Sequence, residues 1–323
     1  GIRIIVELSN FLSKAGNSVT FIIPKGKIST TYHIDPNVKI VEIGPLVKNK
    51  YLSYFLYLLL LPFYCSKYDV LVANFFPTYY PALLGSKISR AKFFYFVQGI
   101  ETTYKSPLSI PLNLLCRTTY ISAAPIIAAN GFLRDTLFSR FQIKVKNINI
   151  GLSSIFFESP PLKEEKKYDL IYFLRHEPWK RRHLFYEITT ILRASRSNLK
   201  ILCVSQDDAL LREALEFGMV AHKPSDDTDL IHTIDKAKVM LLTSSYEGFG
   251  LPPLECMARG LPAVTFDCGG PSVYIRNGEN SFIVETASQA ANLINELLDD
   301  ENFRKRIGAA AMSSDSSPHR SVR

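Results

Sequence analysis

The chain alternates short apolar runs with helical patterns, and this alternation restricts the folds open to it more than any other feature. In the first half each apolar run predicts a buried strand, and the runs lie at residues 19–24, 38–43, 69–75 and 92–98. Near-continuous apolar strands separated by helices are typical of a parallel sheet that is covered on both faces. The first half therefore predicts one doubly wound α/β domain, preceded by an amphipathic helix at residues 1–16.

A second series of the same kind follows the polar, proline-containing stretch 158–167, which predicts a linker. Its predicted strands are 168–174, 199–205, 239–244, 262–266 and 281–285, with helical patterns between them. Two domains suit 323 residues at ~150 residues per domain. The predicted division is an N-terminal Rossmann-like domain (1–157), the linker (158–167), a C-terminal Rossmann-like domain (168–310) and a disordered, serine-rich tail (311–323).

The net charge indicates which classes of partner the protein can bind, and the cysteines indicate in which compartment it works. The formal net charge of +8 favours anionic partners, among them nucleotide phosphates, an acidic membrane surface and nucleic acid. Residues 179–183 form the one dense basic cluster, which is too short for a nucleic-acid interface. Five scattered cysteines without a CxxC pair indicate neither a metal site nor a disulfide framework, and they favour a reducing, cytoplasmic compartment. The histidines lack metal-ligand spacing, so no metal is expected.

The segment 51–64 is uncharged and almost wholly apolar or aromatic. Its 14 residues fall short of the ~20 that a membrane span needs, and Pro62 interrupts it. Two interpretations remain open, a buried core helix and a helix that lies in a membrane interface, where tyrosines are favoured. Lys48 and Lys50, just before the segment, slightly favour the second interpretation.

Residues 247–255, EGFGLPPLE, place two carboxylates around a turn rich in glycine and proline. Gly248 and Gly250 permit backbone conformations and close approaches that side chains would block, and the prolines suit a helix that starts near Leu251. The turn follows a predicted strand directly, so the free amide groups of this helix are expected at a ligand-binding sheet end, where they attract phosphate. Both glutamates, Glu247 and Glu255, can then point at one ligand.

Residues 244–285, which include this turn, resemble the signature of the group 1 glycosyltransferases, the retaining family of GT-B fold with two glutamates seven residues apart. Weaker resemblance extends over most of the chain. The resemblance implies two Rossmann-like domains that face each other across a cleft. It also implies that Glu255 binds the ribose hydroxyls of a nucleotide-sugar donor and that Glu247 contacts the donor sugar. The implied donor-binding amides are those of Gly248, Phe249, Gly250 and Leu251.

Two cations in FLRHEPWKRR correspond to the arginine and lysine with which the family neutralises the donor diphosphate, Arg175 and Lys180. Preorganised cations suit this task independently of the resemblance, because a departing diphosphate develops negative charge. The chain departs from the family pattern on both sides of this pair. Leu174 and Arg181 stand where the family commonly has glycine.

Further departures concern the first domain and the two ends. Many members present a histidine at the cleft edge, whereas this chain offers Gln98 and Glu101 as possible acceptor or sugar contacts, with a structural role equally open. Ser153 stands where the interdomain segment usually ends in aspartate. The family's first strand and its closing C-terminal helix are expected to be absent, which leaves activity of this polypeptide open.

The predicted function is that of a retaining glycosyltransferase that moves a hexose from a nucleoside-diphosphate sugar to a hydroxyl acceptor, in surface polysaccharide or lipid-linked glycan synthesis. The expected partners are this donor, a glycan or lipid-linked acceptor and a peripheral membrane contact through 51–64, without nucleic acid. No cofactor is expected. The expected location is cytoplasmic, peripheral on the inner face of the cell membrane. The alternatives are a GT-B sugar-nucleotide epimerase and an inactive scaffold that binds nucleotide sugars.

Overall fold

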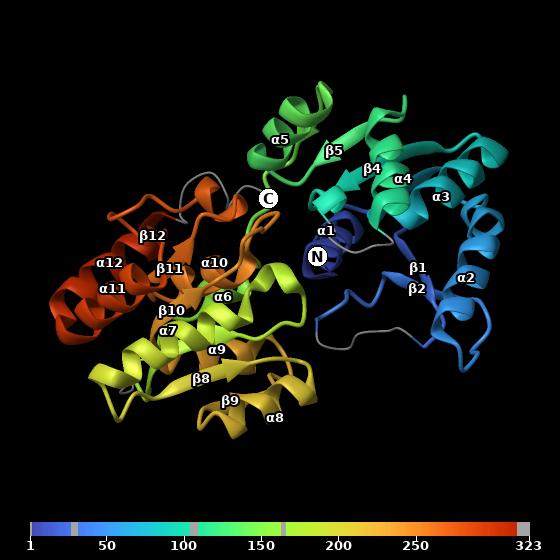
Figure 1. Cartoon of the computed structure of the whole chain (residues 1–323). Coiled ribbons are helices and arrows are strands. Elements are labelled where there is room, and N and C mark those ends of the chain that lie inside the picture. The colour runs from blue at the N-terminus through green and yellow to red at the C-terminus, as the bar shows by residue number, and fades with distance from the viewer. Residues whose placement is uncertain (1, 27–31, 104–108, 163–165, 315–323) are drawn as a thin grey trace. The chain divides into compact units, whose positions relative to one another are not determined.

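The structure is a computed structural model that describes residues 2–26, 32–103, 109–162 and 166–314 (Figure 1). The chain divides into two compact units, Gly1–Ile150 and Gly151–Arg323. Each unit repeats the β–α alternation that the apolar runs predict.

The first domain contains parallel strands, and helices link them from β2 onward. Its strands are β1 (Thr20–Pro24), β2 (Lys39–Ile43), β3 (Val70–Ala73), β4 (Lys92–Val97), β5 (Ile126–Ala128) and β6 (Lys146–Asn147). Its helices are α1 (Ile2–Lys14), α2 (Lys50–Cys65), α3 (Phe76–Ser89), the 3-10 helix η1 (Glu101–Thr103), α4 (Ser109–Ile121) and α5 (Gly131–Phe141).

The sheet of the first domain departs from the prediction in two ways. Strands β1 and β2 pair with each other, while β3, β4, β5 and β6 form a separate four-stranded sheet among the described residues. The expectation of a sheet covered on both faces is wrong for β3, because Leu71 and Ala73 are buried whereas Val70 and Val72 remain about half exposed. Burial therefore alternates along β3, as in a strand with one packed face.

The second domain contains one six-stranded parallel sheet. Its strands are β7 (Tyr168–Phe173), β8 (Ile201–Val204), β9 (Val220–His222), β10 (Ala237–Leu242), β11 (Ala263–Phe266) and β12 (Phe282–Val284). Its helices are α6 (Ile155–Glu158), η2 (Pro178–Lys180), α7 (Arg182–Ser195), α8 (Asp208–Glu216), α9 (Asp227–Asp235), α10 (Leu251–Ala258), η3 (Gly270–Val273), α11 (Ala287–Asp299) and α12 (Glu301–Ser314).

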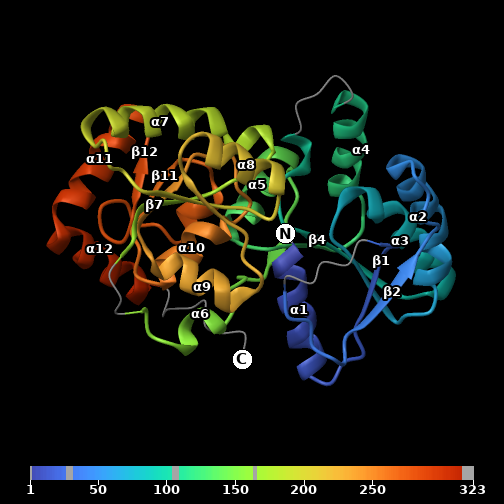
Figure 2. The same ribbon diagram turned by 90° about the horizontal axis from the view of Figure 1, so that it is seen from below.

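The strand order β12-β11-β10-β7-β8-β9 makes this a doubly wound sheet. The chain starts at β7, runs outward through β8 and β9, and then returns to add β10, β11 and β12 on the other side of β7. Helices α7, α8 and α11 lie on one face, and α9 and α10 lie on the other (Figure 2). The order reverses between β7 and β10, which is where open α/β sheets bind their ligands.

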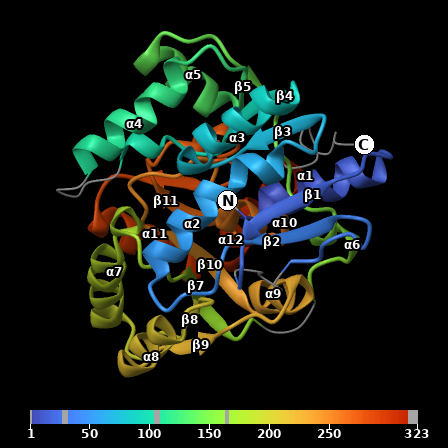
Figure 3. The same cartoon turned by 90° about the vertical axis from the view of Figure 1, so that its right-hand side faces the viewer.

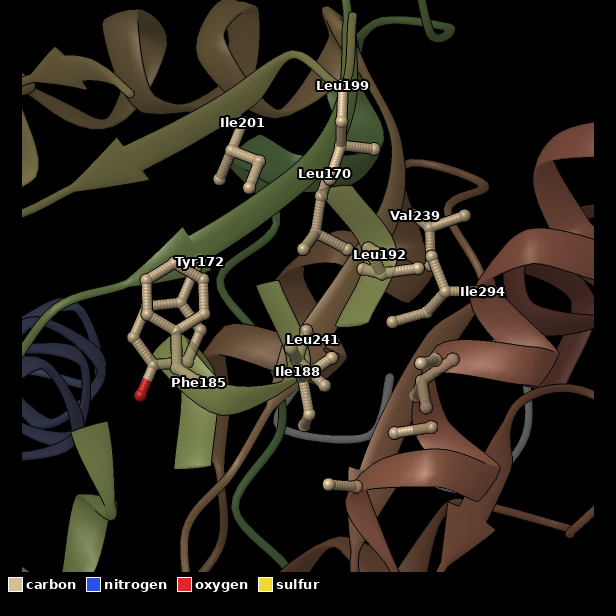
Figure 4. Close-up of a cluster of buried hydrophobic side chains, with 14 of the residues drawn as sticks. Leu170, Tyr172, Phe185, Ile188, Leu192, Leu199, Ile201, Val239, Leu241 and Ile294 are labelled. Carbon is tan, nitrogen blue, oxygen red and sulfur yellow. The ribbon is translucent and has the colours of Figure 1, made fainter. Parts of the chain in front are cut away.

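Apolar side chains form a buried core on the α7 and α11 side of the second domain (Figure 4). The rings of Tyr172 and Phe185 stack at 3.8 Å between centroids, and Leu192 and Ile294 are fully buried beside Val239. Buried branched side chains of this kind each contribute about 1.5–3 kcal/mol relative to exposure. This core supports β7 and β10, the strands that precede the candidate site.

The segment between the domains differs from the predicted linker. The compact units divide after Ile150, and α6 together with residues 159–162 belongs to the second unit. The Arg259 guanidinium accounts for this packing, because it donates hydrogen bonds to the carbonyl oxygens of Phe156, Ser159 and Pro160 at 3.0, 2.6 and 3.1 Å. The proline-rich stretch is therefore held against the second domain by a buried cation. Residues 163–165 lie outside the described residues.

The C-terminal part is more ordered than predicted. Helix α12 extends to Ser314, so residues 311–314 are helical, while 315–323 lie outside the described residues. The helix packs on α10 through glycines, and a Cβ atom at Gly308 would lie 2.1 Å from the carbonyl oxygen of Gly260. Helix α12 is rich in small residues and has no pronounced apolar side, so the spacing of apolar residues in the sequence did not predict it.

Candidate active site

Two loops meet at the reversal point of the second sheet. The loop after β7 carries Arg175 and Lys180, and the loop after β10 carries Glu247. Because β7 and β10 are adjacent and parallel, their carboxyl ends lie at the same edge. Backbone bonds join the two loops directly, since the amide of Ser245 donates to the carbonyl of Trp179 at 2.7 Å. The side chains that the sequence assigns to chemistry are thus brought together by the topology.

Lys180 and Glu247 form a largely buried ion pair at this edge. The distance from Lys180 Nζ to Glu247 Oε1 is 2.7 Å, and the side chains keep 20% and 11% of their surface exposed. Ser244 Oγ donates to the same oxygen at 2.7 Å. The Glu247 backbone is held as well, since its amide donates to Cys268 and its carbonyl accepts from the Gly270 amide. Both side chains are therefore preorganised before any ligand arrives.

Arg181 is a site residue that the sequence interpretation treated only as a departure from the family. Its φ of 48° and ψ of 52° lie in the left-handed region, which favours glycine. Its side chain offsets the strain by donating to the carbonyl oxygens of Thr243 and Ser244 at 2.6 and 3.1 Å. The guanidinium also lies 4.7 Å from the centre of the Phe266 ring. Arg181 therefore stabilises the conformation of the loop that carries Glu247.

The glycine-rich turn has the predicted geometry. Gly250 adopts φ +81°, and helix α10 begins at Leu251, as predicted. A Cβ atom at Gly250 would lie 2.8 Å from Pro271 Cγ. The Phe249 side chain is buried against the Tyr274 ring, so the contribution of Phe249 to a ligand is limited to its backbone. The turn is packed so closely that larger residues would displace the start of α10.

Glu255 lies one turn into α10, and its side chain is buried. Burial of a carboxylate requires polar partners, since an isolated buried charge is costly. The helix dipole at the start of α10 favours negative charge nearby, which stabilises this acid and an incoming phosphate alike. Helix α10 thus supplies both a buried acceptor and an amino terminus that follows Glu247 closely in sequence.

Arg175 is on the same loop as Lys180 but takes no part in the ion pair. Its Nη1 donates to the Leu174 carbonyl at 3.4 Å, and no ion pair joins Arg175 to Glu247 or Glu255 in the part of the chain that the structure describes. The side chain is half-buried. Arg175 is therefore a cation at this sheet edge that forms no ion pair with Glu247 or Glu255 in the described structure.

The two first-domain candidates lie in different environments. The Glu101 carboxylate accepts from Tyr95 Oη at 2.6 Å and from the amide of Phe76, the first residue of α3, at 3.1 Å. Burial raises the pKa of Glu101 to about 7, against the lowering effect of these two hydrogen bonds. The Gln98 side-chain oxygen is buried without a hydrogen-bond partner in the described structure. The contacts of Glu101 thus favour a structural role, whereas Gln98 retains an unused acceptor.

Among the described residues, no group of three or more histidine, cysteine, aspartate or glutamate side chains could hold a metal ion. The described part of the chain also contains no helix that is both long enough and apolar enough to span a membrane.

Comparison with known proteins supports the resemblance. Residues 155–313 match the family model of glycosyl transferases group 1. A D-inositol 3-phosphate glycosyltransferase from Corynebacterium diphtheriae is 30% identical over 100 residues, which cover 29% of this chain and 23% of that protein. The matched stretch therefore spans about a quarter of this curated relative.

Solved structures share the architecture at low identity. A sucrose-phosphate synthase from Thermosynechococcus elongatus has a TM-score of 0.77 at 16% identity, covering 97% of this chain and 88% of that one. Anabaena HepE, in complex with UDP and glucose, has a TM-score of 0.67 at 18% identity, covering 86% and 81%. The glutamate signature, the doubly wound sheet and these matches agree: residues 155–313 belong to the group 1 glycosyltransferases, within a chain that has the GT-B fold.

Proposed function

We propose that this chain is a retaining glycosyltransferase that moves a hexose from a nucleoside-diphosphate sugar to a hydroxyl acceptor. The observation that carries the proposal is the Lys180–Glu247 pair, held at the reversal point of the second sheet and followed by the start of α10. A cation, an amide-rich helix start and two buried acids suit an anionic, hydroxyl-rich ligand.

The proposed role of Lys180 is to neutralise the leaving diphosphate. An ammonium group has three N–H donors, so Lys180 can keep its bond to Glu247 and still donate to a phosphate oxygen. Arg175, whose guanidinium has no carboxylate partner in the site, is the second proposed cation. Both would act most strongly when the bond to the sugar breaks, because negative charge on the diphosphate is then greatest.

The two glutamates take different proposed roles. Glu255 would accept hydrogen bonds from the ribose hydroxyls, and Glu247 from a hydroxyl of the donor sugar. Glu247 is oriented for this by Ser244 and Lys180, which occupy one carboxylate oxygen and leave the second oxygen for the sugar. The amides of Gly248, Phe249, Gly250 and Leu251 complete the proposed donor site.

Retention is proposed to follow front-face attack. The bond between the sugar C1 and the diphosphate oxygen breaks, the acceptor oxygen bonds to C1 on the same face, and the acceptor proton passes to the departing phosphate oxygen. Atoms and charge balance without a nucleophile from the protein and without a cofactor. Gln98 is the proposed first-domain contact to a sugar or acceptor hydroxyl, because its buried side-chain oxygen has no partner in the described structure.

The proposed acceptor is a lipid-linked or surface-polysaccharide intermediate, and the proposed location is peripheral, on the cytoplasmic face of the cell membrane. The support is helix α2, which exposes large apolar side chains to solvent.

The test is a panel of nucleoside-diphosphate sugars, scored first by thermal stabilisation and then by release of the nucleoside diphosphate with hydroxyl acceptors. A ligand at ~100 times its dissociation constant stabilises by ~2.7 kcal/mol. Donor interconversion without an acceptor would indicate an epimerase, and binding without turnover would indicate a scaffold. If no nucleotide sugar stabilises the protein, the donor site is refuted.

Two variants assign the roles once a donor is known. Glu255→Gln should weaken donor binding by ~1.5–3 kcal/mol, because it removes a charged acceptor, while Glu296→Gln on the exposed face of α11 should not. Lys180→Met should lower turnover by ~10²-fold or more with little effect on binding of the bare nucleoside, whereas Lys305→Met, at an exposed position of α12, should leave turnover unchanged. Isothermal calorimetry and steady-state kinetics separate the two effects.

A further inference from the structure

We propose that α2, α3 and α4 of the first domain form one membrane-docking surface that binds anionic lipid headgroups and inserts apolar side chains at the bilayer interface. This surface consists of the exposed residues of these three helices. The inference deepens the peripheral location proposed above, but it does not depend on the transfer reaction.

Helix α2 has a buried side and an apolar exposed side. Tyr57, Leu61 and Cys65 recur every four residues and are buried. The opposite side carries exposed residues at helical spacing, namely Leu52, Phe55, Leu59 and Phe63. The interpretation of 51–64 as a buried core helix therefore holds for one side only. An amphipathic surface helix normally exposes polar residues, so this exposed stripe needs a partner.

Helices α3 and α4 repeat the pattern. In α3 the exposed stripe is Tyr80, Leu84 and Ile88, at intervals of four residues. In α4 the exposed apolar residues are Ile110, Leu112, Leu114, Leu115 and Ile121. Monomeric soluble proteins rarely expose apolar surface over several neighbouring elements, and such surface marks an interaction site.

The three helices are neighbours, which makes their stripes one surface (Figure 3). Helix α3 packs so closely on α2 that a Cβ atom at Gly85 would lie 2.6 Å from Cys65 Cβ. Helices α3 and α4 are joined by a hydrogen bond between Tyr80 Oη and Thr118 Oγ1. Helices α3 and α4 also connect strands that follow one another in the same direction across the sheet, so right-handed crossovers place both on one face.

The charge around this surface identifies its partner. Helices α2, α3 and α4 contain no acidic residue. From residue 45 to residue 121 the chain has eight basic residues and two acidic ones, Asp69 and the buried Glu101. The exposed basic side chains are Lys48, Lys67, Lys87, Arg90, Lys92 and Arg117.

An anionic bilayer fits this combination, whereas a second copy of the same face does not. Two such faces would bring like charges together, which is unfavourable. An anionic leaflet attracts basic residues, and exposed tyrosines such as Tyr51 and Tyr64 suit the headgroup region. Helices that lie in the interface combine an apolar face with basic residues in this way.

Vesicle flotation tests the proposal with the full chain. Vesicles that contain phosphatidylglycerol should carry the protein upward, and vesicles of phosphatidylcholine alone should carry much less. Binding should fall when ionic strength rises from ~0.1 to ~1 M, because the Debye length shortens from ~10 to ~3 Å. Lys48→Gln, Lys87→Gln and Arg117→Gln should each weaken partitioning about fivefold.

Apolar variants separate docking from simple electrostatic attraction. Phe55→Ser combined with Leu114→Ser should abolish flotation, while Leu215→Ser combined with Phe217→Ser, a matched exposed pair in the second domain, should leave it unchanged. All four residues are exposed, so circular dichroism should show intact folding. Absence of flotation by the wild-type protein, or a self-association in ultracentrifugation that the Phe55 and Leu114 changes abolish, would overturn the proposal. Nucleotide-sugar binding is measured separately, so its failure would leave this outcome intact.

Discussion

The two domains are built from the same alternation of strands and helices, yet they differ in how many large apolar side chains they expose to solvent. Of the 27 large hydrophobic residues that are exposed in the described structure, 23 lie in residues 1–150 and four in the remainder. The first domain also has a split sheet, whereas the second has one continuous six-stranded sheet. A similar pattern of apolar runs thus produced two different surfaces.

The difference in surface corresponds to a difference in buried charge. In the second domain the buried acids Asp235 and Glu247 face cations, Arg259 and Lys180. In the first domain the buried Glu101 is held by neutral groups. The comparison suggests a rigid second domain with preorganised charges and a first domain specialised for contact with a partner. Three predictions test this contrast.

The largest expected effect comes from the buried ion pair of the second domain. The Arg259 guanidinium binds Asp235 through two bonds, at 2.9 and 2.7 Å, and the two side chains are 1% and 0% exposed. Arg259→Met should lower the free energy of unfolding by about 3–5 kcal/mol, because Asp235 is left buried without its cation. Trp179 is the single tryptophan, so urea unfolding followed by its fluorescence reports on this domain.

The matched control breaks an exposed ion pair of the same domain. Arg276→Met removes the pair with Glu279, whose side chains are largely exposed, and should cost no more than about 1 kcal/mol. Equal losses in the two variants would mean that burial of charge does not stabilise the second domain in the way proposed.

A smaller effect is expected at the turn that starts α10. Gly250→Ala should destabilise the second domain by about 1–2 kcal/mol through the left-handed backbone, and further through the contact with Pro271. Gly278 has nearly the same φ, +80°, but nothing within 4 Å of a Cβ atom, so Gly278→Ala should show the backbone effect alone. Chemical denaturation of both variants isolates the steric part, and identical values would argue against a tightly packed turn.

A further prediction concerns pH and the first domain. The pKa of Glu101 is about 7 in the folded protein, above its ordinary 4.5, because the side chain is buried. The folded state therefore holds this proton more tightly than the unfolded chain, and the stability of the first domain should fall as pH rises from about 4.5 to about 7. Urea unfolding followed by far-ultraviolet circular dichroism measures this, with tryptophan fluorescence as the internal reference for the second domain.

Glu101→Gln should flatten that pH dependence, since it keeps an acceptor for Tyr95 and Phe76 but cannot ionise. Asp135→Asn is the control, because the hydrogen bond and charge of Arg134 lower the pKa of Asp135 below its ordinary 3.8, outside this window. A pH dependence that survives the glutamine substitution would have another origin.

Local chemistry explains which parts of the site could be predicted. The turn 247–255 is recognisable because its glycines, prolines and acids lie close together in sequence, and α10 begins at the predicted residue. The role of Arg181 could not be read in the same way, since it depends on a left-handed backbone and on carbonyls some 60 residues away. The burial of Glu101 by Tyr95 and α3 is a tertiary contact of the same kind.

The amino-acid sequence by itself determined the two α/β domains, the glutamate signature and the positive charge, because periodicity, turn chemistry and composition are local properties. Only the tertiary structure decided which side of α2 faces solvent, where the interdomain segment packs and how Lys180 meets Glu247. Exposure, long-range pairing and the burial of charge depend on which elements become neighbours. Which elements become neighbours is decided by the packing of the whole chain, so no local sequence pattern predicts it.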